Sequence, residues 1–73
     1  MTKIEVEVYV FRVGQKIRVN TVLGEYLWHV AGIVDDNQVV LKTWLKTRKY
    51  WRYFVIDDFA LTLGIDSGRY KVE

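Results

Sequence analysis

The sequence predicts an all-β fold, a small antiparallel barrel of five to six short strands in a chain of 73 residues. Three observations lead to this prediction. Apolar and polar residues alternate in several short runs, as they do in strands with one buried face. Clusters of Gly, Asp, Asn and Ser separate these runs at intervals of about ten residues, which is typical of small barrels. Hydrophobic residues make up 51% of the chain, which favours a packed core over disorder.

The first predicted strand spans residues 3–11. Its apolar face consists of four aliphatic residues, Ile4, Val6, Val8 and Val10. Gly14 interrupts this alternation, and a second alternating run at residues 16–23 predicts the next strand. We expect this strand to end at Gly24 and Glu25, because glycine favours a turn.

The third predicted strand, residues 26–34, is rich in aromatic and β-branched residues. Gly32 lies inside it and predicts a bulge or a bend. Residues 35–37, Asp-Asp-Asn, are turn formers between two apolar runs and predict a hairpin connection. Such a turn is a far more common role for this acidic pair than binding a hard cation.

The next two strands, residues 39–45 and 50–56, form a hairpin with two possible registers. A two-residue loop at Thr47 and Arg48 places Trp44 opposite Trp51. A loop one residue longer turns the second strand over, so that Tyr50 and Arg52 are exposed instead. Three residues point outward together in both registers: Lys42, Trp44 and Lys46.

The last part of the chain has a different pattern. Asp57 or Asp58 is suited to cap a short helical segment, which we expect to be one 3₁₀ turn near residues 58–63. Gly64 is expected to end this turn in the left-handed conformation. Residues 69–72 predict a short final strand.

The order of these elements resembles the SH3-like barrels. Residues 13–19, Val-Gly-Gln-Lys-Ile-Arg-Val, resemble their opening strand, and a tryptophan-bearing strand, a hairpin and a 3₁₀ turn follow in matching order. The resemblance covers about residues 12–73 and implies a single SH3-like domain over residues 1–73. The Ala-Leu-Tyr-x-Tyr and proline signatures of peptide-binding SH3 domains are missing. Recognition of proline-rich ligands is therefore not expected, whereas the nucleic-acid-binding and adaptor branches remain open.

The segment 37–56 predicts the function. It contains five basic residues and no acid, whereas the rest of the chain contains six bases and nine acids, so the segment is +5 and the remainder −3. Basic side chains neutralise phosphates and aromatic rings stack on bases. The sequence therefore predicts a nucleic-acid-binding accessory or regulatory protein, for DNA or RNA. The predicted binding residues are Lys42, Trp44, Lys46, Arg48, Lys49, Trp51 and Arg52, and Lys16 and Arg18 would widen this surface.

A protein–protein interaction module or an oligomeric adaptor is the alternative function. Tryptophan, tyrosine and arginine are also the residues enriched in interface hot spots. Salt distinguishes the two functions, because phosphate contacts weaken steeply with ionic strength and an aromatic protein interface does not.

The sequence carries little that indicates catalysis, a metal or a cofactor. The chain has no cysteine and one histidine, His29, so the ligands of an ordinary transition-metal site are missing. No phosphate-binding glycine loop or nucleophile elbow is present. The Val-Gln-Ile-Tyr strand of the plasmid-borne dihydrofolate reductases, which are small SH3-like enzymes, is also missing. We therefore expect no enzyme, no cofactor and no metal.

Composition also predicts where the protein works and with what. No run approaches the roughly 20 apolar residues of a membrane span, and the first residues do not resemble a signal peptide. We expect a cytoplasmic protein without a membrane partner. Residues 3–11 form a strand additional to the basic barrel, which either lengthens the sheet of its own chain or pairs with a second copy in a homo-oligomer.

Overall fold

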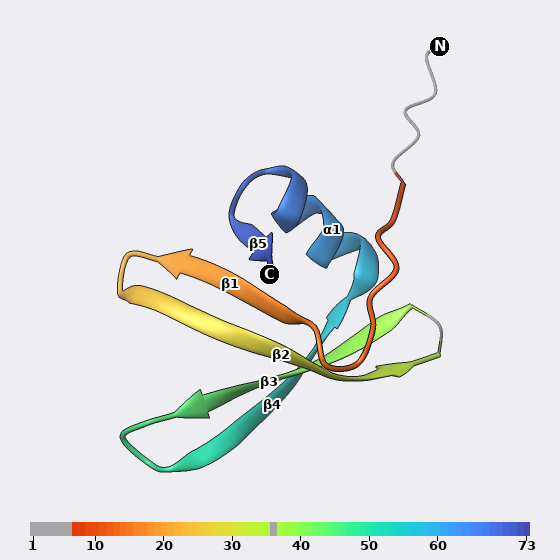
Figure 1. Cartoon of the computed structure of the whole chain (residues 1–73). Helices are drawn as coiled ribbons and strands as arrows, with labels where there is room; N and C mark the ends of the chain where they lie inside the picture. Colours follow the sequence, from red (N-terminus) through yellow and green to blue (C-terminus); the bar gives the residue numbers. More distant parts are fainter. Residues whose placement is uncertain (1–6, 36) are drawn as a thin grey trace.

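The structure, a computed structural model, describes residues 7–35 and 37–73. They form one five-stranded antiparallel sheet and one α-helix (Figure 1). In chain order the elements are β1 (Lys16–Thr21), β2 (Gly24–Val34), β3 (Gln38–Leu45), β4 (Tyr50–Asp57), α1 (Asp58–Asp66) and β5 (Tyr70–Val72).

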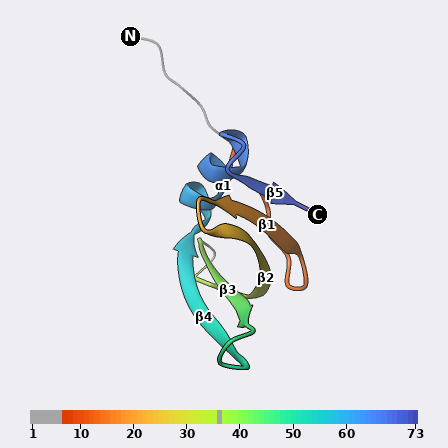
Figure 2. The same ribbon diagram turned by 90° about the vertical axis from the view of Figure 1, so that its left-hand side faces the viewer.

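The strand order is β4-β3-β2-β1-β5, with β4 and β5 at opposite edges of the row (Figure 2). This confirms the predicted all-β class, its five antiparallel strands and the short helical segment before the last strand. The sheet is not a closed barrel, because β4 and β5 do not pair with each other. It is a small antiparallel sheet compatible with an SH3-like arrangement.

Strand β2 joins two hairpins that diverge from each other (Figure 1). Its first half pairs with β1 and its second half pairs with β3, and only Trp28 and His29 take part in both pairings. The register of β2 against β3 shifts between Val30 and Gly32, which confirms the bulge predicted at this glycine. The extra residue increases the local twist and separates the two hairpins.

The β1–β2 turn differs from the prediction. It consists of Val22 and Leu23, and Gly24 begins β2 instead of ending β1. The hydroxyl of Thr21 donates to the carbonyl oxygen of Gly24 at 2.9 Å and accepts the N–H of Leu23 at 3.2 Å. Because the threonine satisfies the backbone of the turn, two exposed aliphatic residues can form it.

The β3–β4 hairpin has the register that a two-residue loop predicts. Trp44 lies opposite Trp51, and Lys42 lies opposite Tyr53. The turn itself has four residues, 46–49, because Lys49 adopts a positive φ of 55° and its N–H donates to the carbonyl oxygen of Leu45 at 2.7 Å.

Helix α1 is longer than the predicted 3₁₀ turn. Asp57 is its N-cap and accepts the N–H of Phe59 at 2.9 Å. Gly64 lies inside the helix and does not end it. The end is formed by Gly68, which has a φ of 82°, and by a bond of 2.9 Å from the N–H of Arg69 to the carbonyl oxygen of Gly64.

The role of Gly64 is close packing. A Cβ atom at this position would overlap the ring of Tyr70 from β5. The missing side chain therefore lets β5 lie against α1, a requirement that the local sequence does not reveal.

The core lies between the inner face of the sheet and α1. Its buried residues are Phe11, Ile17, Val19, Val30, Val39, Leu41 and Leu61. The burial predicted for Val19, Val30 and Leu41 is confirmed. Tyr50, which the observed register places on the same face, is exposed because it lies at the outer end of the β3–β4 hairpin.

The predicted strand at residues 3–11 is wrong for the part that the structure describes, and residues 3–6 lie outside the described residues. Residues 7–11 form no strand. Tyr9 instead binds α1: its N–H donates to the hydroxyl of Thr62 at 3.1 Å and its own hydroxyl donates to Asp66 at 2.8 Å. Phe11 is buried in the core. These contacts hold the segment against the helix and the core without pairing it to the sheet.

Candidate nucleic-acid interface

The β3–β4 hairpin presents different chemistry on its two faces. Its inner face carries Leu41 and Thr43, which are buried. Its outer face carries two pairs of directly opposed residues, Trp44 with Trp51 and Lys42 with Tyr53. The strand alternation predicted in the sequence therefore does bring lysine and aromatic side chains together.

Neighbouring strands extend this outer face. His29 of β2 lies opposite Lys42, and Lys16 of β1 lies opposite His29, so all three share the outer face. We call the resulting surface the outer basic-aromatic face, and it consists of Lys16, His29, Lys42, Trp44, Trp51 and Tyr53.

Trp51 is surrounded by other members of this face. Its ring centroid lies 5.4 Å from that of Trp44 and 5.3 Å from that of His29, both in edge-to-face contact. The Nζ atom of Lys42 lies 4.6 Å from the Trp51 ring centroid, within cation–π range. Trp51 is 37% exposed, against 45% for Trp44 and 59% for Tyr53. Trp44 and Tyr53 are therefore the freer stacking surfaces, and Trp51 packs against Trp44.

The basic turn, residues 46–49, lies beyond this face. It carries Lys46, Arg48 and Lys49, all exposed. The pairing of β3 with β2 reaches only to Thr43, so the turn sits at the end of a two-stranded ribbon (Figure 1). Within the described part of the chain, the only ion pairs are those of Arg18. The turn cations thus have no carboxylate partner there.

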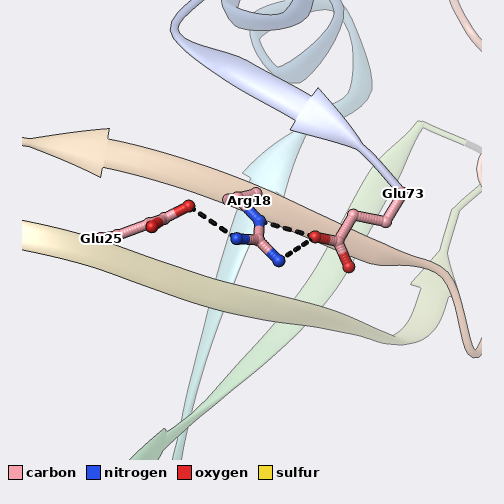
Figure 3. Close-up of polar contacts among 3 residues, drawn as sticks. All are labelled: Arg18, Glu25 and Glu73. Carbon is pink, nitrogen blue, oxygen red and sulfur yellow. Dashed lines mark hydrogen bonds and ion pairs between the residues drawn. The ribbon is translucent and has the colours of Figure 1, made fainter.

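Arg18 does not add free charge to the surface, although the sequence suggested that it would. Its Nη1 donates to Glu25 at 2.9 Å and its Nε donates to Glu73 at 2.6 Å (Figure 3). The hydrogen bonds to Glu25 and then to Glu73 raise the pKa of the Arg18 guanidinium above its ordinary value. Arg18 therefore connects β2, β1 and the residue after β5.

Arg52 lies on the opposite face from Lys42, Trp44 and Trp51. It pairs with the buried Thr43 and lines an open inner groove of about 490 Å³ between the two hairpins. The other lining residues are Val19, Thr21, Tyr26, Trp28, Thr43, Leu45 and Phe54. Arg52 is the one charged member of this lining.

His29 and Tyr53 are on the outer basic-aromatic face but were not among the predicted binding residues. Tyr53 could have been found from parity, because it faces Lys42 in the register that the structure adopts. Partial burial lowers the pKa of His29 below its ordinary value, and the charges of Lys16 and Lys42 lower it further. Burial and the two lysines therefore both disfavour the protonated imidazole.

Comparisons with protein-family models, with curated proteins and with solved structures found no match to this chain. Across residues 7–35 and 37–73, no three His, Asp or Glu side chains come together as a metal-binding group. The helix that the structure describes is too short to cross a membrane.

Proposed function

We propose that the chain is an SH3-like protein that binds single-stranded nucleic acid through the outer basic-aromatic face and the basic turn. One observation carries the proposal: exposed Trp44 and Tyr53 rings lie beside Lys42 and next to the cations of residues 46–49. The SH3-like assignment is supported by the strand order, in which the first and last strands are neighbours and a helical segment precedes the last.

Phosphates and bases are bound by different parts of this surface. Lys42, Lys46, Arg48 and Lys49 neutralise phosphates, and Trp44 and Tyr53 stack on bases. A stacked base must be unpaired, which is why we propose a single strand and not a duplex. We place the protein in the cytoplasm. This compartment is reducing, and the chain has no cysteine and so does not depend on a disulfide.

Fluorescence anisotropy with single-stranded and duplex oligonucleotides tests the proposal. The single strand should bind more tightly at low salt, and its affinity should fall steeply between about 50 and 200 mM salt. Trp44→Ala should weaken binding roughly 5- to 150-fold, which corresponds to about 1–3 kcal/mol per stacked base.

Phe59→Ala is the matched control, because Phe59 on α1 is 44% exposed, close to the 45% of Trp44. It should leave binding unchanged. Equal losses in both variants, or no binding of wild-type protein at low salt, would refute the proposal.

The second candidate is a protein–protein interaction module that uses the same exposed rings. The exposure of Trp44 and Tyr53 favours it, because such rings are frequent anchors of interfaces. Binding that is insensitive to salt but lost in Trp44→Ala would support this function over the first.

A further inference from the structure

The outer edge of β4 has unpaired backbone groups. The N–H of Asp58 donates to the carbonyl oxygen of Asn37 at 2.8 Å, which fixes the phase of the β3–β4 ladder. Bonding alternates along an antiparallel pair, so Trp51, Tyr53 and Val55 direct their N–H and C=O groups away from β3. No strand that the structure describes pairs with this edge.

This edge also lacks the usual protection against strand addition. β4 has eight residues and contains no proline and no glycine, and its register against β3 is regular. Within it, Arg52 is the only basic residue, and Tyr53 and Val55 are exposed. Natural edge strands are normally short, bulged, charged or covered, so an edge of this kind indicates a strand partner.

The sequence of the N-terminal segment has the alternating pattern of a strand. Residues 3–8 alternate acidic or basic with aliphatic side chains, and the described part from residue 7 onward pairs with no strand of the sheet. Tyr9, the residue after this segment, binds α1 through its N–H and its hydroxyl. Six extended residues span about 20 Å, enough to cover β4 from Trp51 to Ile56.

We propose that residues 3–8 of one copy add as an antiparallel strand to the outer edge of β4 in a second copy, and that two copies do so reciprocally. The net charges fit, because this arm carries Glu5 and Glu7 against one base, Lys3, whereas residues 37–56, which include all of β4 except Asp57, carry five bases and no acid. Backbone bonds to Trp51, Tyr53 and Val55 would provide the pairing.

The geometry favours a second copy over the arm's own β4. Val8 and Asp58 line the same small hollow of about 210 Å³, so the arm starts beside the Asp57 end of β4. A segment that paired from there with β4 of its own chain would have to be parallel to it, and parallel pairing is slightly less stable per residue. A second copy approaches without this constraint, and reciprocal exchange gives a closed two-fold dimer.

Sedimentation at tens of micromolar tests this inference with three proteins and a control. Wild-type protein should sediment at twice the chain mass of 8.7 kDa. A deletion of residues 2–6 and, separately, Val55→Pro should each give the single-chain mass. The proline removes an N–H that points away from β3, so the ladder within the chain is kept.

Val10→Asn is the control, because Val10 is 82% exposed and lies outside the proposed arm. It should sediment as the wild type does, and circular dichroism should show a folded protein in every case. A wild-type protein that is strictly monomeric overturns the inference. So does association that persists in the deletion variant, since it would then use another surface, such as β4 against β4.

Discussion

Trp44 and Trp51 face each other across two strands but differ in their surroundings. Trp51 contacts Trp44, His29 and the ammonium of Lys42, whereas Trp44 has Trp51 as its only aromatic partner among the residues described. The Trp51 ring is therefore fixed by three neighbours, whereas the Trp44 ring has one such neighbour and is more exposed. The stability of the outer face should therefore depend on Trp51, and binding on Trp44.

Trp51→Ala should lower the free energy of unfolding by about 1–3 kcal/mol, because it removes two aromatic pairs and a cation–π contact. Trp44→Ala should cost less than about 1.5 kcal/mol, because it removes one aromatic pair. Urea denaturation measures both values. Equal losses would show that the three contacts of Trp51 do not stabilise the fold.

His29 gives the stability a pH dependence. Burial and the charges of Lys16 and Lys42 lower its pKa in the folded state, so the unfolded chain binds the proton more readily. Stability should thus be fully present above the unfolded pKa of about 6.5 and should fall as the pH drops below it. His29→Gln should flatten this part of the profile, which thermal denaturation from about pH 5 to 8 would measure. An unchanged slope in the variant would assign the effect to other groups.

At the scale of elements, α1 and β5 depend on one glycine. The ring of Tyr70 occupies the space that a side chain at position 64 would need. Gly64→Ala should therefore destabilise the protein by about 1–3 kcal/mol through overpacking, even though alanine is the better helix former. Urea denaturation measures the change.

Gly32→Ala is the matched control for this prediction. A Cβ atom at position 32 meets no atom within 4 Å, and its φ is not positive, so the variant should cost less than about 1 kcal/mol. In a double-mutant cycle, Gly64→Ala with Tyr70→Leu should cost less than the two single changes together. Strict additivity would contradict a direct clash.

The β3–β4 hairpin was predictable because its alternation is a property of neighbouring residues. The pairing of Trp44 with Trp51 is one of the two registers that the sequence left open, and the structure adopts it. The structure of the N-terminal segment and the end of α1 depend instead on contacts between residues that are distant in the sequence or in different elements. Tyr9 binds Thr62 and Asp66, which overrides the strand pattern of its own segment.

The predicted end of the helical segment at Gly64 was wrong for a different reason. Both Gly64 and Gly68 are suitable helix terminators in the sequence, and only the packing of Tyr70 shows which one acts. The arrangement of the candidate site was predictable only where it depends on the alternation of side chains along the β3–β4 hairpin. Composition placed Arg52 with the other cations, whereas strand parity separates it onto the inner face.

Over the whole molecule, the charge is divided between two faces of one sheet. The outer basic-aromatic face and the basic turn hold most cations of the segment 37–56, and Arg52 lies alone in the inner groove. Each of these cations contributes equally to the net charge of +2. They differ only in where they can contact a bound polyanion. Two variants that each lose one positive charge, from different places, can therefore distinguish a direct phosphate contact from attraction by the net charge of the protein.

Lys46→Ala and Arg52→Ala each reduce the net charge by one, from opposite faces. If phosphates bind at the basic turn, Lys46→Ala should reduce the slope of log affinity against log salt by about 0.7 for a single strand, the contribution of one phosphate contact. Arg52→Ala should leave the slope close to that of the wild type, because its side chain lines the inner groove. Anisotropy titrations at four or more salt concentrations would give both slopes. Equal reductions would mean that net charge alone attracts the nucleic acid, and a larger reduction in Arg52→Ala would move the binding surface to the inner groove.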